Sequence, residues 1–307
     1  MQDIDRVEAA EGVISAPVLQ MKKTMALLCL AGAILLWGTS FMATKVALAE
    51  FAPTMVIWLR MTLASLLVFA VYPRIPKPQY RAGDWKVLGF LCLMQPCLYF
   101  LLETYAITLT TSSQAGMISA LVPLLVALGA WLVLKEPMSV MGVSGLAISI
   151  GGVVWLSMSG APDVSAPNPA LGNLMEVGAM CCAAIYMVVM KRLSVRYSTW
   201  WLTGLQCVSG ALFFLPTLWF SGIPSFAGVS HSAWLAVAYL GLFVTLGAFG
   251  LYNMAMTLMP AGKAAQAINL VSPVALITGW ALLGESLSLM QLVPCAVIGV
   301  GVWIGRR

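Results

Sequence analysis

Long apolar runs separated by short polar stretches fill the chain from Met25 onwards. Each run is about 20 residues long, the length that an α-helix needs to cross roughly 30 Å of hydrocarbon. Ten runs follow one another, at 25–44, 54–72, 86–107, 113–134, 138–158, 171–190, 200–220, 233–255, 263–283 and 287–305. The pattern predicts an all-α polytopic membrane protein with ten transmembrane helices. A β-barrel would instead show short segments of alternating hydrophobicity.

The fourth and ninth runs look like two copies of one segment. Each is apolar throughout, has one internal proline and stops at an acid: Pro123 and Glu136 in the first copy, Pro273 and Glu285 in the second. Glycine-rich runs that end near a tryptophan follow both copies. Apolar segments that are duplicated, with a proline at matching mid-span positions, are the best sequence pointer to the binding site of a transporter.

The duplication divides the chain into two halves of five runs, 25–158 and 171–305, joined by the proline-containing outer linker 159–170. Because five is odd, the second half enters the membrane from the opposite side. This predicts two inverted five-helix repeats around a central cavity, with inward-open and outward-open shapes of similar energy. Residues 1–21 are polar and acidic, so we expect a disordered cytoplasmic tail.

The position of the charges sets the orientation. All of the 16 Lys and Arg residues except Lys45 and Arg60 lie in the amino terminus, alternate loops and the carboxyl terminus. The positive-inside rule therefore predicts that both termini are cytoplasmic, in the inner membrane of a bacterium. The composition, 61% hydrophobic and 9% charged, excludes a soluble globule. The seven cysteines lie in apolar runs without metal-binding spacing, so we expect no metal, no cofactor and no nucleic-acid partner.

Several motifs together resemble the ten-helix EamA branch of the drug/metabolite transporter superfamily. The resemblance covers nearly all of 25–305 and is carried by Trp37-Gly38-Thr39-Ser40-Phe41, Lys45, Arg60, 115–123, Glu136 and Glu285. It implies a secondary carrier with a central cavity between the repeats, and many members are similar in exporting amino acids or other small metabolites. The sixth run departs from the pattern, because it has Glu176 and Tyr186 where the first has Trp-Gly and Phe.

Three charged residues lie in the interior of the predicted spans, Arg60, Glu103 and Glu176, and Lys45 follows the outer end of span 1; all four lie in the outer half. Arg60 is well within the hydrocarbon, where an unpaired Arg costs roughly 2.5 to 3.5 kcal/mol. It is either a fixed ion pair that braces helices or the group that captures a substrate carboxylate. Lys45 is expected to snorkel to the interface. Glu103 and Glu176 are candidates for proton coupling, unless Arg60 or Lys45 keeps them ionised.

Other candidates for the cavity wall are prolines and an amide. Pro123 and Pro273 free backbone carbonyls one turn earlier, and these either line the cavity or accompany a simple kink. Asn269 is one turn before Pro273 and serves either as a polar group of the cavity or as a link between helices. The acids Glu136 and Glu285 lie where a new helix begins, so interaction with a helix amino terminus explains them.

Aromatic residues on spans 1, 3, 6 and 8 could form a substrate slot or act as interfacial anchors, namely Trp37, Phe41, Tyr99, Tyr105, Tyr186 and Tyr252. Pairs of small residues in spans 5 and 10, such as Gly145 with Ser149 and Gly301 with Gly305, indicate close helix contact. We expect these two spans to be scaffold and to offer a surface for a homodimer.

The leading interpretation is a secondary active transporter that exports small amphipathic metabolites such as amino acids. A second is the efflux of lipophilic cationic drugs, with Glu103 or Glu176 as the membrane acid. A membrane-embedded enzyme that modifies lipids is disfavoured, because the chain has one histidine, no HExxH motif and no phosphate loop. The chain is therefore predicted not to be an enzyme, and its partners are a small-molecule substrate and the bilayer.

Overall fold

The computed structural model describes residues 16–76, 78–135, 138–159, 162–221, 226, 228–258, 267–285 and 288–305. Residues 1–15 of the predicted tail and Glu136 lie outside this part. Helix begins at Ala16 and so includes residues 16–21 of the predicted tail; the disorder of the tail stays a prediction.

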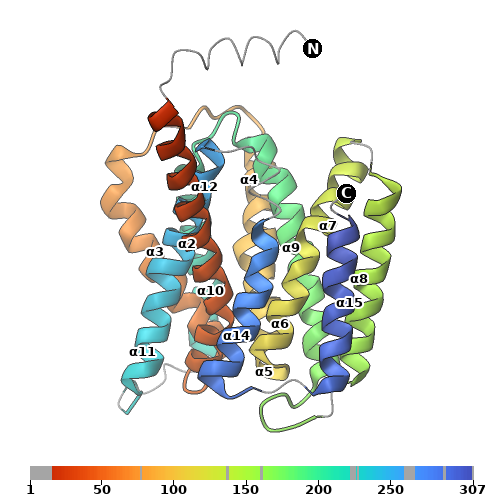
Figure 1. Cartoon of the computed structure of the whole chain (residues 1–307). Helices are drawn as coiled ribbons and strands as arrows, with labels where there is room; N and C mark the ends of the chain where they lie inside the picture. The colour runs from red at the N-terminus through yellow and green to blue at the C-terminus, as the bar shows by residue number, and fades with distance from the viewer. Residues whose placement is uncertain are drawn as a thin grey trace.

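The described chain folds into a bundle of long helical rods that lie side by side (Figure 1). Repeat 1 contains α2 (Ala16–Leu48), α3 (Pro53–Val71), the rod α4 (Asp84–Cys92), η2 (Leu93–Leu98) and α5 (Tyr99–Leu109), the rod α6 (Ser112–Ile118), η3 (Ser119–Leu121), α7 (Val122–Gly129) and η4 (Ala130–Leu134), and α8 (Val140–Ser159). Repeat 2 contains α9 (Pro169–Leu193), α10 (Thr199–Ser221), the rod α11 (His231–Ala238), η5 (Tyr239–Ala248) and α12 (Phe249–Leu258), then η6 (Ile268–Leu270) with α14 (Val271–Leu283), and α15 (Leu289–Gly305). A short η1 (Tyr72–Arg74) follows α3.

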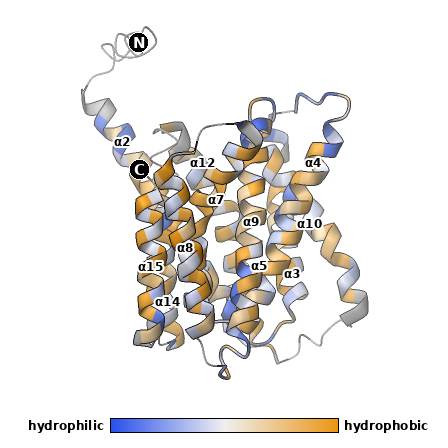
Figure 2. Cartoon of the chain, turned by 90° about the vertical axis from the view of Figure 1, so that its right-hand side faces the viewer, coloured by the Kyte–Doolittle hydropathy of each residue, from blue (hydrophilic) through white to orange (hydrophobic). Residues whose placement is uncertain are grey.

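Of the described helices, eight are long and apolar enough to cross a membrane, and two shorter apolar helices, 268–283 and 290–305, occupy the places of the ninth and tenth predicted spans. The predicted ten-helix fold is therefore confirmed. Apolar side chains cover most of the length of the rods, and hydrophilic residues gather toward their ends (Figure 2). This is the distribution expected of helices whose sides face lipid.

The two repeats run in opposite directions. In Figure 1, α2 descends from the end of the bundle that carries both termini, whereas α9 ascends toward that end. The repeats also share local irregularities: the third rod of each contains a wide π-type turn, η2 or η5, and the fourth contains a tight 3₁₀ turn, η3 or η6, just before its proline. The inverted duplication is thus visible in the backbone as well as in the sequence.

Polar side chains fix the starts of three helices. The Thr111 hydroxyl accepts from the Gln114 amide, Asn168 Oδ1 accepts from the Leu171 amide, and the Ser230 hydroxyl accepts from the Ala233 amide. Each removes one of the unpaired N–H groups of a first helical turn. All three caps lie at the end of the bundle away from the termini (Figure 1).

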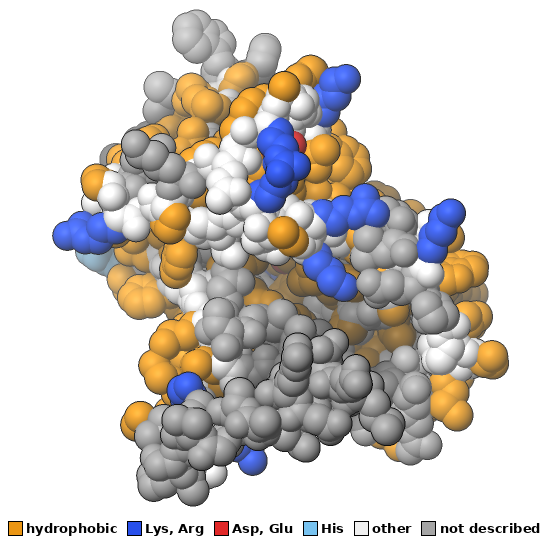
Figure 3. All heavy atoms as spheres, turned by 90° about the horizontal axis from the view of Figure 1, so that it is seen from above, with side chains coloured by type: hydrophobic (Ala, Val, Ile, Leu, Met, Phe, Trp, Pro, Cys, Tyr) orange, Lys and Arg blue, Asp and Glu red, His pale blue; other side chains and the backbone are white. Residues whose placement is uncertain are grey.

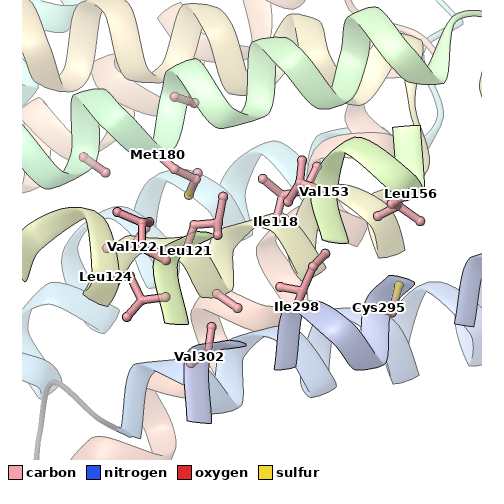
Figure 4. Packing of buried hydrophobic residues seen from close by; sticks show 14 residues of the cluster. Ile118, Leu121, Val122, Leu124, Val153, Leu156, Met180, Cys295, Ile298 and Val302 are labelled. Atoms are coloured by element: carbon pink, nitrogen blue, oxygen red, sulfur yellow. The ribbon is translucent and has the colours of Figure 1, made fainter. Parts of the chain in front are cut away.

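A buried apolar cluster joins the repeats (Figure 4). The cluster draws on the fourth rod, α8, α9 and α15, with Ile118, Leu121, Val122, Leu124, Leu156, Met180, Ile298 and Val302 among its members. In a membrane such a cluster gains nothing over lipid from hydrophobicity alone, so close fit has to hold it together.

That close fit is clearest between α8 and α15. A Cβ on Gly145 would lie 2.4 Å from the Gly301 carbonyl oxygen, and a Cβ on Gly301 would lie 2.3 Å from Ser149 Oγ. The Ser149 hydroxyl also donates to the Ile298 carbonyl at 3.2 Å. The predicted close contact of small residues is confirmed, and it joins spans 5 and 10 within one chain. The homodimer surface stays a prediction.

Candidate functional site

A central cavity lies between the two repeats, and its empty space, open solvent included, is about 730 Å³. Seven of the rods contribute to its wall, which consists of Trp37, Ser40, Phe41, Arg60, Gln95, Tyr99, Phe100, Glu103, Ser119, Val122, Met180, Ala183, Tyr186, Met187, Val244, Phe249, Ile268 and Val271.

Most of the residues predicted for the site meet in this wall: Trp37, Phe41, Arg60, Tyr99, Glu103 and Tyr186. Glu176 is not among these wall residues. It is fully buried, and its carboxyl interacts electrostatically with that of Glu103. Of the remaining aromatic candidates, Tyr252 packs on Trp37 with ring centroids 5.3 Å apart, whereas Tyr105 is 37% exposed.

Pro123, Pro273 and Asn269 are not among the wall residues that the structure describes. The wall instead contains residues just before each proline, Ser119 and Val122 in repeat 1 and Ile268 and Val271 in repeat 2. The expectation that the segment one turn before each proline faces the cavity therefore agrees with the structure, while the proline rings lie elsewhere. Asn269 is half-buried, and its Oδ1 has no hydrogen-bond partner within the described residues.

Arg60 is buried in the wall with few partners. Its Nε and Nη2 donate to Thr245 Oγ1 at 3.3 and 3.2 Å, and its guanidinium carbon is 4.1 Å from the centre of the Phe100 ring. The Thr245 hydroxyl itself donates a hydrogen bond to the Leu240 carbonyl oxygen at 2.8 Å. No carboxylate oxygen among the described residues lies within 4.0 Å of the guanidinium. A direct, fixed ion pair with Glu103 or Glu176 is thus not formed.

The two acids beside Arg60 differ in their surroundings. Glu103 Oε1 accepts a hydrogen bond of 2.5 Å from the Tyr99 hydroxyl, and its carboxyl faces the cavity. Glu176 has no hydrogen-bond partner at either carboxyl oxygen within the described part of the chain. An ionised carboxylate without partners in an apolar interior is very unfavourable, so this environment favours the neutral, protonated form of Glu176.

Aromatic rings form much of the remaining wall. Trp37 packs edge-on against Phe249 at 5.5 Å between ring centroids. Rings whose polar ends have partners in the bundle leave flat apolar faces on a cavity, and such faces suit a small amphipathic ligand.

The third rod of repeat 1 is interrupted at the cavity, a feature that we did not predict. Gln95 has extended backbone angles, φ −142° and ψ 123°, inside an otherwise helical segment, and Pro96 follows it. The carbonyl oxygen of Gln95 accepts from Gln206 Nε2 at 2.8 Å. Irregular backbone at membrane depth persists only where protein or cavity water satisfies it. The Gln-Pro pair within an apolar run was the available sequence signal.

Lys45 lies at the end of the bundle away from the termini and binds three backbone carbonyls. Its Nζ donates to Ile107 O and Thr110 O at 2.7 Å each and to Ser165 O at 2.6 Å. One of these carbonyls, of Ile107, belongs to the last turn of α5, and that of Thr110 belongs to its C-cap residue; a cation stabilises this negative dipole end. Lys45 thus has partners within the protein at the end of span 1, and its reach to the interface stays a prediction.

Glu285 binds the first turn of α6, on the other side of the same loop. Its two carboxylate oxygens accept from the backbone amides of Ser112 and Ser113 at 2.8 and 2.9 Å and from their hydroxyls at 2.9 and 2.7 Å. The expected interaction with a helix amino terminus is present, but the helix is α6 of the opposite repeat and not the one that follows. A Cβ on Gly279 would lie 2.6 Å from Glu285 Oε2, so only glycine leaves room for this contact.

A buried amide network closes the same end between the repeats. Asn173 Nδ2 donates to Gln114 Oε1 at 3.0 Å, and the Thr110 hydroxyl donates to Asn173 Oδ1 at 2.9 Å. Each of these three residues is at most 1% exposed. We call Lys45, Glu285 and the network of Thr110, Gln114 and Asn173 the end seal.

In the exposed linker beside the end seal, hydrogen bonds from the Ser165 hydroxyl and the Ala166 amide hold the pKa of the Asp163 carboxyl below its ordinary value.

The opposite end of the bundle, which carries both termini, is rich in Lys and Arg (Figure 3). Arg196 binds Asp84 there through two hydrogen bonds of 2.8 and 2.9 Å, and the Tyr197 hydroxyl donates to the same carboxylate at 2.6 Å. This ion pair ties the loop after α9 to the start of α4.

Comparisons with known proteins agree with this architecture. The model of the EamA-like transporter family matches residues 24–158 and again residues 170–305. The uncharacterized transporter YvbV of Bacillus subtilis is 28% identical over 286 residues, which cover 91% of this chain and 90% of that protein. A protein of Streptantibioticus cattleyicolor named "Probable terminal-alkyne amino-acid exporter" is 24% identical over 94% of this chain and 95% of its own length.

A solved crystal structure shares the fold, with a TM-score of 0.63 and 22% identity over 92% of this chain and 98% of that one. The two matched segments coincide with the two inverted repeats that enclose the cavity. The chain is thus a member of the EamA-like transporter family, within the drug/metabolite transporter superfamily, and is built from two EamA domains.

Proposed function

We propose that this transporter is a secondary carrier that exports small zwitterionic metabolites, amino acids and their relatives, by alternating access. The observation that carries the proposal is the Arg60 guanidinium, which is buried in the cavity wall, faces no carboxylate within 4.0 Å among the described residues and has one hydroxyl as its hydrogen-bond acceptor. Guanidinium presents five N–H donors in a fork that matches a carboxylate, so most of its capacity is unused.

A zwitterion matches the second charge of the wall as well. Glu103 faces the same cavity and is the carboxyl that acts on Arg60 electrostatically. A substrate carboxylate on Arg60 and a substrate ammonium on Glu103 would neutralise both groups without a net change in cavity charge. The relative named as a probable amino-acid exporter supports this substrate class.

Efflux of lipophilic cations is the second candidate function. The aromatic wall and the acids Glu103 and Glu176 would suit a cation. Arg60 counts against it, because a cationic ligand in the same cavity would be repelled by the guanidinium. The two functions predict opposite effects of removing that charge.

Proton coupling is assigned to the two acids. Glu176 has no partner, and Glu103 shares one hydrogen bond with Tyr99. In our proposal a proton moves between Glu176 and water of the cavity as the substrate ammonium occupies or leaves Glu103. Two carboxyls in one buried site hold one proton more readily than they both ionise, which gives competition between proton and ammonium.

The orientation follows from the charges. We place the Lys- and Arg-rich end, with both termini, in the cytoplasm of a bacterium, so the end seal faces outward and the cavity is closed on that side. Reporter fusions after residues 160 and 307 test this placement, and they should report opposite sides. A periplasmic carboxyl terminus would contradict it. A homodimer through α8 and α15 would use the lipid-facing sides of these helices, since their facing sides contact each other.

The test of function is counterflow of labelled amino acids into liposomes that contain the purified chain. Arg60→Lys keeps the charge and loses the fork, so affinity for zwitterions should fall by about tenfold or more while thermal stability is kept. Arg60→Gln should abolish zwitterion counterflow. Faster movement of a lipophilic cation in Arg60→Gln would instead favour the second function. Met187→Ala, at another wall position, controls for general damage to the cavity.

A further inference from the structure

A second, smaller pocket adjoins the central cavity on the side of α10. Its empty space, open solvent included, is about 290 Å³, and it shares Gln95, Phe100 and Phe249 with the wall of the central cavity. The rest of its lining consists of Met61, Pro96, Thr203, Gln206, Cys207 and Thr245. We call it the side pocket.

The side pocket owes its existence to the interruption of the third rod. At Gln95 the backbone leaves helical angles, and Gln206 on α10 satisfies the carbonyl that this frees. One end of the pocket is limited by Gly210, where an added Cβ would lie 2.6 Å from the Pro96 ring and 2.9 Å from Met61 Cγ. The corresponding π-type turn of repeat 2, η5, continues without an extended residue. The break beside the pocket therefore occurs in the third rod of repeat 1 and not in that of repeat 2, although residues of both repeats line the pocket.

Its position relative to Arg60 matters most. Thr245, which lines the side pocket, accepts both hydrogen bonds from Arg60, and Phe100, which lines both pockets, lies 4.1 Å from the guanidinium carbon. The side chain of an α-amino acid leaves the carbon next to its carboxylate. A carboxylate held on Arg60 thus brings the side chain to the mouth of this pocket.

We propose that the side pocket receives the side chain of the transported amino acid and so determines which amino acids are carried. This inference rests on the zwitterion function proposed above. The lining contains apolar groups from Met61, Phe100 and Cys207 and uncharged polar groups from Thr203 and Gln206, and no Asp, Glu, Lys or Arg among the residues described there. A charged side chain would lose its hydration without a partner, so the pocket selects short, uncharged side chains.

The experiment measures counterflow in liposomes for alanine, threonine, leucine, phenylalanine, lysine and glutamate. The wild type should carry alanine and threonine best and lysine and glutamate least. Met61→Ala enlarges the pocket and should raise the leucine-to-alanine ratio about tenfold, since one methylene in an apolar pocket changes discrimination by about 10-fold or more. Thr203→Met fills the pocket and should lower the same ratio while alanine is still carried.

Met187→Ala is the matched control, because Met187 lines the central cavity but not the side pocket. It should leave the leucine-to-alanine ratio within twofold of the wild type. The proposal is overturned if Met61→Ala and Thr203→Met both carry alanine with an unchanged ratio, or if Met187→Ala shifts the ratio as much as Met61→Ala does. A wild type that carries no amino acid overturns the zwitterion function itself, which is a different result.

Discussion

The charges of the end seal and the charges of the cavity are both buried in one bundle, but their partners differ. At the seal, Lys45 donates to three carbonyls, and Glu285 accepts from four donors. At the cavity, Arg60 has one hydroxyl acceptor, and Glu176 has no hydrogen-bond partner within the described residues. The hydrogen-bonding groups of Lys45 and Glu285 are all used within the protein, whereas those of Arg60 and Glu176 are not.

The difference separates structural charges from functional ones. A buried charge whose hydrogen bonds are all made within the fold braces it, and removing that charge leaves its partners unsatisfied. A buried charge with unused donors or acceptors marks a pathway or a ligand site in a membrane protein. The same kind of substitution should therefore cost more stability at the end seal than at the cavity.

The largest effect on stability is expected for Glu285→Gln. The two carboxylate oxygens of Glu285 now accept hydrogen bonds from four donors. An amide has only one oxygen, and its NH₂ group would face an N–H or O–H donor. The free energy of unfolding in detergent should fall by about 3 kcal/mol. Thermal melting followed by tryptophan fluorescence measures it.

Glu50→Gln is the control for Glu285→Gln. Glu50 also binds the start of a helix, through the Ser230 amide and hydroxyl, but it is exposed. A shift as large in Glu50→Gln as in Glu285→Gln would show that burial of the acid is not what matters.

Lys45→Met should have the next largest effect. The side chain keeps its length, but three carbonyl oxygens lose their shared donor, and the free energy of unfolding should fall by about 2 kcal/mol. The comparison is Arg60→Met, which leaves one hydroxyl without a donor and should cost less. Equal losses in the two variants, measured by the same melting assay, would contradict the distinction.

Glu176→Gln should barely change stability. A neutral carboxyl and an amide have nearly the same shape, so the free energy of unfolding should stay within about 0.5 kcal/mol or rise. Transport should lose its dependence on a proton gradient, because an amide cannot carry the proton. Counterflow should continue at the wild-type rate, since it needs no gradient. Loss of both stability and counterflow would make Glu176 a structural residue.

The smallest effect concerns Asp163 and pH. Because its pKa is lowered in the folded protein by Ser165, its contribution to stability is present above the ordinary carboxyl pKa, about 3.9, and is lost as pH falls through the lower folded value. Asp163→Asn should melt slightly earlier than the wild type at pH 7, and the difference should be smaller at pH 3. A gap that stays constant between the two pH values would exclude this origin.

The rods and their inverted order could be predicted. Bilayer thickness fixes the length of a helix, and a repeat with an odd number of spans makes its second copy enter the membrane from the opposite side. The buried charged residues could also be identified from the sequence as candidates, since Arg60, Glu103 and Glu176 are costly in hydrocarbon wherever they lie. What the spacing could not give is which of these side chains touch, because their partners come from other rods, as Thr245 does for Arg60.

The end seal was missed for the same reason. Lys45 appears at the end of an apolar run, where snorkelling is the usual outcome, and its carbonyl partners are 62 to 120 residues away in the sequence. The duplication also drew attention to Pro123 and Pro273, which occur in both copies. The break that shapes the site is at Gln95 and Pro96, which have no counterpart in the eighth run. Repetition identifies shared architecture, whereas the asymmetric residues carry the specific site.

The end seal also has a kinetic consequence. The turn between α5 and α6 is held by a cation from the first span of one repeat and by an anion from the fourth span of the other. In the alternating-access cycle proposed above, both sets of hydrogen bonds have to break before water reaches the cavity from that side. Their strength then contributes to the barrier to opening, so we expect turnover to fall as these bonds are strengthened.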